Sequence, residues 1–144
     1  MKEAPPGVAI VRASWWGTGV FTASAVAAVA VSGPLRSAAV AVAMVLFLAG
    51  CVVFAIAYLR AVSRSRTEAV AVSNLFFLTG GTAPPAVKRS LLWSLGVQVA
   101  VALATAIARP YTSLAFGTLV PVYGLALCGL WAARHGTFDP RPPG

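Results

Sequence analysis

The chain has 144 residues, which suits a single domain, and 59% of them are hydrophobic while only 10% are charged. An ordinary soluble domain carries about 25% charged residues, so this composition predicts an integral membrane protein. The net charge is +8. The basic residues lie between apolar runs and are not interleaved with aromatic residues, which excludes nucleic acid as a partner.

Four apolar runs are long enough to cross a bilayer, which takes about 17–25 helical residues. They contain no Asp, Glu, Lys, Arg or His, and they cover approximately residues 15–31, 38–59, 91–108 and 114–133. Because the bilayer core has no water to bond the backbone, each run is predicted to be an α-helix. The sequence therefore predicts an all-α membrane domain over residues 1–144.

Connections of two lengths arrange these helices as two hairpins. Tight turns at 33–36 and 109–112 close each hairpin, and a longer loop, 60–90, joins them. At an offset of 77 residues the hairpins share a faint repeat, in which Trp16, Gly19, Val20, Ala23, Ala25 and Ala27 match Trp93, Gly96, Val97, Ala100, Ala102 and Ala104. Such matches also arise by chance in an Ala/Val-rich chain, so duplication remains an alternative.

The first run has a second interpretation. Lys2 and Arg12, the apolar run and the sequence AVAVSG resemble the parts of a cleaved secretory signal. However, Trp15 and Trp16 suit an interfacial anchor, and the run is long for a signal peptide. We expect the segment to be retained.

The middle loop contains a predicted interfacial helix. Ser65 and Glu68 fit an S-x-x-E capping box, which predicts a helix from about residue 66 to 79, ended by Gly80 and Gly81. Its apolar stretch is too short to span a bilayer.

The end of this loop resembles a phosphate loop only superficially. Val87, not glycine, precedes Lys88, so the backbone cannot wrap a phosphate there. The prolines at 84 and 85 are predicted to begin the third long helix.

Orientation follows from the basic residues. Nine fall on one side of the predicted bundle, namely Lys2, Arg12, Arg60, Arg64, Arg66, Lys88, Arg89, Arg134 and Arg141, and two, Arg36 and Arg109, on the other. This asymmetry predicts cytoplasmic N- and C-termini in the plasma membrane. Contact with anionic lipid of the inner leaflet or with a partner protein is predicted at Arg60, Arg64, Arg66, Lys88, Arg89, Leu75, Phe76, Phe77 and Leu78.

Small residues repeat every fourth position on two runs and predict close helix packing. They are Gly96, Ala100, Ala104 and Ala108 on the third run, and Gly124 and Cys128 on the fourth. Packing inside the four-helix bundle is the simpler interpretation. The alternative is that one face is left for another membrane protein or a second copy of the chain.

Gln98 and Pro121 are the other notable residues within spans. Gln98 is the only amide there, and Thr22 lies at a similar depth, so a Gln–Thr hydrogen bond between the first and third long helices is expected in preference to a substrate contact. Pro121 is predicted to kink the fourth helix, because it removes a bond to the Gly117 carbonyl.

The predicted spans lack the side chains that ion-coupled transport or catalysis requires. They contain no ionisable residue for ion coupling and no base to activate a nucleophile, and the single histidine, His135, follows the last span. Cys51 and Cys128 form no C-x-x-C pair and have no His at ligand spacing. We therefore expect no catalytic residue, no cofactor and no metal site, and the chain is not expected to be an enzyme.

In its layout and its Ala/Val content, with nine Arg against two Lys, the chain resembles the uncharacterised small four-helix integral membrane proteins of high-GC actinobacteria. The resemblance rests on no single motif, so it implies an architecture and no functional residue. Small multidrug exporters carry a Glu within the first helix and disulfide-forming quinone reductases carry paired cysteines, and this chain has neither.

Two functions fit these observations. The first is a non-enzymatic accessory or structural subunit of a plasma-membrane assembly. The alternative is a small oligomeric transporter or channel for an apolar or lipid-like substrate.

Overall fold

The computed structural model describes residues 7–31, 33–108 and 117–143. Over these residues the protein is all-α, as predicted. Its helices are α1 (Val8–Ala30), α2 (Pro34–Arg64), α3 (Val72–Phe77), α4 (Pro85–Ala108) and α5 (Pro121–His135).

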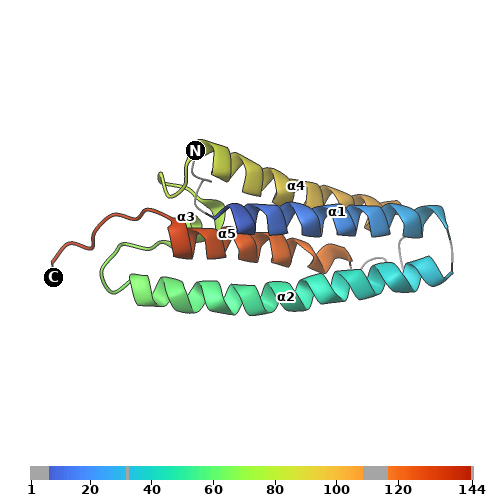
Figure 1. Cartoon of the computed structure of the whole chain (residues 1–144), viewed down its shortest axis with the longest axis horizontal. Coiled ribbons are helices and arrows are strands. Elements are labelled where there is room, and N and C mark those ends of the chain that lie inside the picture. Colours follow the sequence, from blue (N-terminus) through green and yellow to red (C-terminus); the bar gives the residue numbers. More distant parts are fainter. Residues whose placement is uncertain (1–6, 32, 109–116, 144) are drawn as a thin grey trace.

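The long helices run alternately up and down in an elongated bundle (Figure 1). α2 packs most extensively on α5, and α1 packs on α4, α2 and α5. α2 and α4 therefore lie on opposite sides of the other two long helices, where each leaves much of its surface uncovered (Figure 1). The start of α1, the end of α2, the start of α4 and the end of α5 share one end of the bundle, and α3 packs against α5 there.

Two helices, α2 and α4, are long and apolar enough to cross a membrane, within the described residues. Only 17% of the apolar stretch of α2 and 28% of that of α4 are buried in the protein. The core helix of a soluble protein would be largely buried. The exposure of α2 and α4 therefore distinguishes them from such a core helix. α5 has 15 residues and begins after the start of the fourth predicted span, so it forms only part of that span. The predicted turn at 109–112 and the first residues of the fourth predicted span lie outside the described residues.

Two prolines begin helices. Pro85 is the first residue of α4, as predicted. Pro121 is the first residue of α5 and follows a short 3₁₀ turn, so the predicted kink within a continuous helix is wrong. The physical reason is that a first-turn proline has no hydrogen bond to lose, and its fixed φ suits a helix start.

The middle loop differs from its prediction. α2 continues to Arg64, beyond the apolar run that ends at residue 59, so Ser65 closes α2 instead of opening a new helix. The Ser65 hydroxyl donates to the Val62 carbonyl at 2.7 Å, and Glu68 pairs with Arg64. The capping-box interpretation is therefore wrong, and the short helix is confined to the six residues of α3.

The main core lies at the end of the bundle that holds α3, where α3, α4 and α5 bury Leu75, Phe76, Leu91, Leu127 and Trp131. Closer to the middle, glycines allow tight contact with α5. A Cβ atom on Gly50 would come within 2.8 Å of the Tyr123 backbone, so α2 can approach α5 this closely only with glycine there.

Candidate functional site

Four buried polar side chains join α1 to α4. Ser14, Thr18, Ser94 and Gln98 are each at most 3% exposed, and we call them the polar cluster. The two residues from each helix are four positions apart, so they project from the same helix face. The helices run in the same direction here, and residues 80 positions apart in the sequence lie opposite each other.

The hydrogen bonds of the polar cluster permit one consistent set of proton positions. Thr18 donates its hydroxyl to the Ser14 carbonyl at 2.9 Å, so its oxygen accepts from Gln98 Nε2 at 2.8 Å and from the Ser94 hydroxyl at 2.7 Å. Ser94 then has no proton left for its 2.7 Å contact with the Ser14 hydroxyl, so Ser14 is the donor there. All three hydroxyl groups are satisfied without a charged group.

The amide oxygen of Gln98 is buried and has no hydrogen-bond partner in the part of the chain that the structure describes. It faces Gly124 of α5, where a Cβ atom would come within 2.5 Å of it. The expected Gln–Thr hydrogen bond joins α1 to α4, but its partner is Thr18 and not Thr22. The register of the two helices places Thr18 opposite Gln98, which counting depth along separate spans did not reveal.

The polar cluster is suited to holding helices together. It contains hydroxyls and an amide, and a hydroxyl needs a neighbouring base before it can act as a nucleophile. Each such interhelical hydrogen bond contributes about 0.6–2 kcal/mol within a membrane. Over the described ranges, no group of three His, Cys, Asp or Glu side chains is placed to hold a metal ion. Cys51 is exposed and Cys128 is buried, each as a free thiol.

The small residues predicted to pack helices divide into two sets. Gly124 and Cys128 are buried in the bundle. The third-run residues Gly96, Ala100, Ala104 and Ala108 are exposed instead, which corrects the simpler interpretation that they pack inside the bundle. α4 packs inward through a different face, formed by Leu91, Ser94, Gln98, Ala102 and Thr105. We call the exposed set the outer face of α4.

The predicted contact surface at 75–78 is mostly internal. Leu75, Phe76 and Leu78 are buried, and only Phe77 is exposed. Phe76 stacks on Phe54 of α2 with ring centroids 4.9 Å apart, and its ring occupies the space beside Gly129 of α5. The apolar side chains of this loop therefore pack at one end of the bundle. Because most of the segment 75–78 is buried, a partner cannot dock on the whole of it.

The predicted basic contact residues have different environments. Arg60, Arg66 and Arg89 are exposed, and Lys88 is half-buried. Arg64 is half-buried and bonded within the protein, so it is not a free surface charge.

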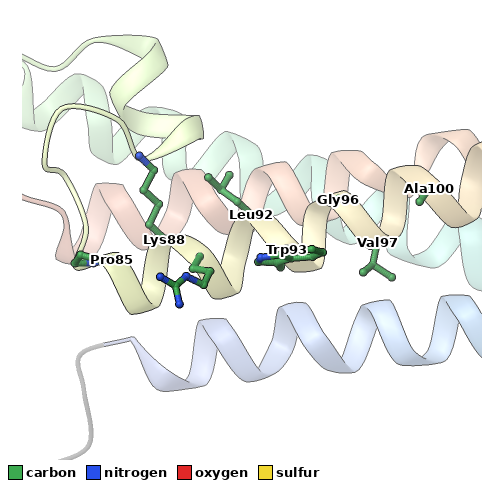
Figure 2. A pocket seen from close by; sticks show the side chains of 8 residues that line it. Pro85, Lys88, Leu92, Trp93, Gly96, Val97 and Ala100 are labelled. Carbon is green, nitrogen blue, oxygen red and sulfur yellow. The ribbon is translucent and has the colours of Figure 1, made fainter.

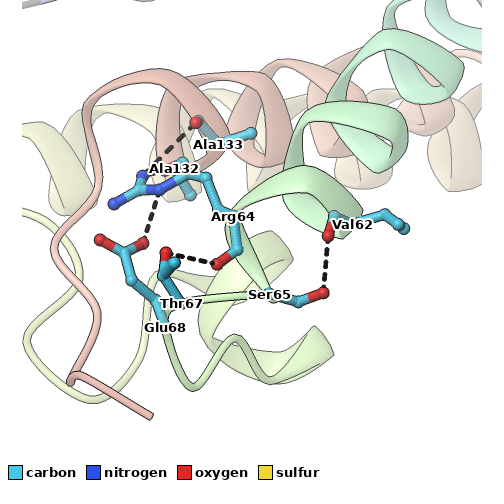
Figure 3. Close-up of polar contacts among 7 residues, drawn as sticks. All are labelled: Val62, Arg64, Ser65, Thr67, Glu68, Ala132 and Ala133. Carbon is cyan, nitrogen blue, oxygen red and sulfur yellow. Dashed lines mark hydrogen bonds and ion pairs between the residues drawn. The ribbon is translucent and has the colours of Figure 1, made fainter.

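Arg64 links the end of α2 to the end of α5 (Figure 3). Its Nε donates to Glu68 Oε2 at 2.7 Å, and its Nη1 donates to the carbonyls of Ala132 and Ala133 at 3.1 and 3.4 Å. Its guanidinium also lies 4.8 Å from the centre of the Phe138 ring. A cation at these last carbonyls of α5 complements the negative end of the helix dipole.

The segment after α5 is fixed beside this ion pair. The Ala69 amide donates to the Asp139 carbonyl at 2.8 Å, and the Arg141 amide donates to the Thr67 carbonyl at 2.9 Å. We call Arg64, Glu68 and these paired backbone segments the end latch.

A groove of about 610 Å³ runs along the outside of α4 (Figure 2). Its lining follows one side of the helix through about four turns and comprises Pro85, Lys88, Arg89, Leu92, Trp93, Gly96, Val97 and Ala100. Cations therefore lie at one end of the groove, and the remainder is apolar.

Sequence reasoning missed Ser14, Thr18 and Ser94 as partners of Gln98. Part of the signal was available, because Ser14 and Thr18, like Ser94 and Gln98, are four residues apart; Thr18 and Thr22 have the same spacing, so the spacing alone did not select the pair. It missed the end latch because the contacts of Arg64 cross 68 and 69 residues of chain.

Comparison with known proteins gives no relative from which a function could be transferred. No family model, curated protein or solved structure matches the chain.

Proposed function

We propose that the protein is a non-enzymatic accessory or structural subunit of a plasma-membrane assembly, with four spans and cytoplasmic termini. The observation that carries the proposal is the outward-facing apolar surface of α2 and α4. Large exposed side chains on these helices include Val45, Leu48, Val52, Leu59, Trp93, Leu103 and Ile107. Soluble monomers rarely expose apolar patches larger than a few hundred Å², so lipid or a partner helix is the expected covering.

The distribution of charge supports the orientation. Most of the described basic residues, including Arg12, Arg60, Lys88, Arg89 and Arg134, lie near the helix ends that share one end of the bundle. Arg36, in the first turn of α2, lies toward the other end. Such an asymmetry favours a cytoplasmic position for the basic end.

The outer face of α4 supports a role in assembly. Small residues allow two helix backbones to approach closely, and in lipid this contact is a main source of helix association. Because Ala104 and Ala108 are exposed, leucine at these positions would block a partner helix without entering the bundle.

Purification from native membranes in mild detergent tests this proposal. We expect the wild-type protein to retain a stoichiometric, unrelated membrane protein, and A104L/A108L to lose it. The matched control is Ile107→Leu, which changes an exposed apolar residue beside the same face and should leave the partner bound. All three proteins should melt at similar temperatures.

The alternative function gives a different outcome. A homo-oligomer that mediates flux of an apolar substrate in liposomes, with no unrelated partner, would contradict the accessory role.

A further inference from the structure

We infer that the groove on α4 binds an anionic phospholipid, with the phosphate beside Lys88 and Arg89 and one acyl chain along Trp93, Gly96 and Val97. The inference rests on the proposed membrane location. The inference adds a specific ligand site to that membrane location, at the end of the outer face of α4 that is nearest the basic residues. Ala104 and Ala108 lie beyond the groove and remain available to a partner helix.

The shape of the groove fits an extended chain. Gly96 forms part of its floor, and a Cβ atom added there would meet nothing within 4 Å, so the glycine leaves open space on the helix surface. Trp93 is 65% exposed, and its ring lies along the helix beside Gly96 (Figure 2). An acyl chain would cover the ring and fill the space above the glycine.

The charges favour an anionic headgroup. Lys88 and Arg89 line one end of the groove, and neither forms an ion pair with a described residue. Of the described acidic residues, Glu68 is paired with Arg64, and Asp139 lies in the segment after α5. Basic groups at a membrane surface attract anionic lipids, and here two consecutive residues, Lys88 and Arg89, line one end of an apolar groove.

The length of the groove also fits one leaflet. From Lys88 to Ala100 α4 rises about 18 Å, at roughly 1.5 Å per residue. Half of a bilayer core is about 15 Å thick, so a headgroup at Lys88 places the chain end near Ala100.

α1 carries a similar groove that serves as a control. It is lined by Trp15, Trp16, Gly19, Val20 and Ala23, so it shares the order Trp, Gly, Val, Ala with the α4 groove. Gly19 also has open space around it. No cation lines this groove. The basic residue of α1, Arg12, lines the neighbouring groove between α1 and α4 instead. A headgroup-specific site is therefore expected on α4 and not on α1.

Native mass spectrometry of the full chain, released from detergent with equal amounts of phosphatidylglycerol and phosphatidylcholine, tests the inference. Wild type should bind one phosphatidylglycerol in preference to phosphatidylcholine. K88Q/R89Q should lose that preference, with affinity falling about fivefold for each charge removed. Gly96→Leu should reduce binding by filling the groove, whereas Gly19→Leu should bind as wild type does.

Three results would overturn the inference: equal binding of the two lipids by wild type, a preference that persists in K88Q/R89Q, or equal loss in Gly96→Leu and Gly19→Leu. Melting temperatures of the variants identify any loss through unfolding, and both glycines face open space, so folding should persist. Recovery of wild type in the soluble fraction of cells would contradict the membrane location itself, which distinguishes that failure from a failure of the lipid site.

Discussion

At the scale of single residues, Gly124 and Gln98 determine how closely α5 approaches α1 and α4. The Gln98 side chain is fully buried, donates to Thr18, and turns its amide oxygen toward the bare Cα of Gly124. A Cα–H group can make a weak favourable contact with such an oxygen, but a methyl group cannot fit. Glycine is therefore required at position 124 by the neighbouring amide.

We predict that Gly124→Ala destabilises the protein by about 1–3 kcal/mol, the usual range for overpacking a core. Thermal unfolding in detergent measures the change. Gly19→Ala is the control, because it meets no atom and should raise stability by up to about 1 kcal/mol through helix propensity. In a Gln98→Ala background the cost of Gly124→Ala should largely disappear. Equal effects of the two glycine substitutions would show that Gln98 does not constrain α5.

At the scale of elements, the end latch joins the ends of α2 and α5 to the segment that follows α5. The Arg64 and Glu68 side chains are 26% and 29% exposed, so their ion pair is partly screened by water. The bonds from Arg64 to the α5 carbonyls add to it, because they place a cation at the last turn of the helix, where Ala132 also accepts from the Gly136 amide.

We predict that Arg64→Gln weakens the latch by about 1 kcal/mol, since a hydrogen bond to a charged group is lost at a partly exposed site. Hydrogen exchange should show faster exchange of the Ala69 and Arg141 amides, which bond across the latch. Arg66→Gln, two residues away and exposed, is the matched control. Unchanged exchange in Arg64→Gln, or equal changes in both variants, would contradict the role of the latch.

The elements also show what sequence could and could not predict. The apolar runs located the long helices, and Pro85 marked the start of α4, because both signals are local. The end of α2 at Arg64 and the internal position of Phe76 depend on contacts with α5, which lies far along the chain. Patterns within one segment do not contain that information, so the capping box and the 75–78 surface were misread.

The same distinction applies to the candidate site. The Gln–Thr bond could be predicted because a buried amide in lipid needs a partner. Which threonine it selects, and which face of α4 points outward, depend on the register and order of the helices in the bundle. The exposed position of Gly96 was therefore not predictable from its spacing, since the same spacing suits an inner or an outer face.

At the scale of the whole molecule, the protein is a bundle with an apolar outer surface and one strongly basic end. α2 and α4 carry most of that surface because α1 and α5 lie between them (Figure 1). In the proposed membrane placement, lipid would cover the bundle along its length and the basic end would lie on the cytoplasmic side. The proposed partner face and the proposed lipid groove both depend on this placement.

Cysteine labelling in cells tests that placement most directly. In a background with Cys51 and Cys128 replaced by Ala, Thr67→Cys marks the basic end and Ser37→Cys the opposite end, and both positions are exposed. We predict a membrane-bound protein in which an impermeant maleimide labels Ser37→Cys in intact cells but labels Thr67→Cys only after permeabilisation. Labelling of Thr67→Cys in intact cells, or recovery of the protein in the soluble fraction, would contradict it.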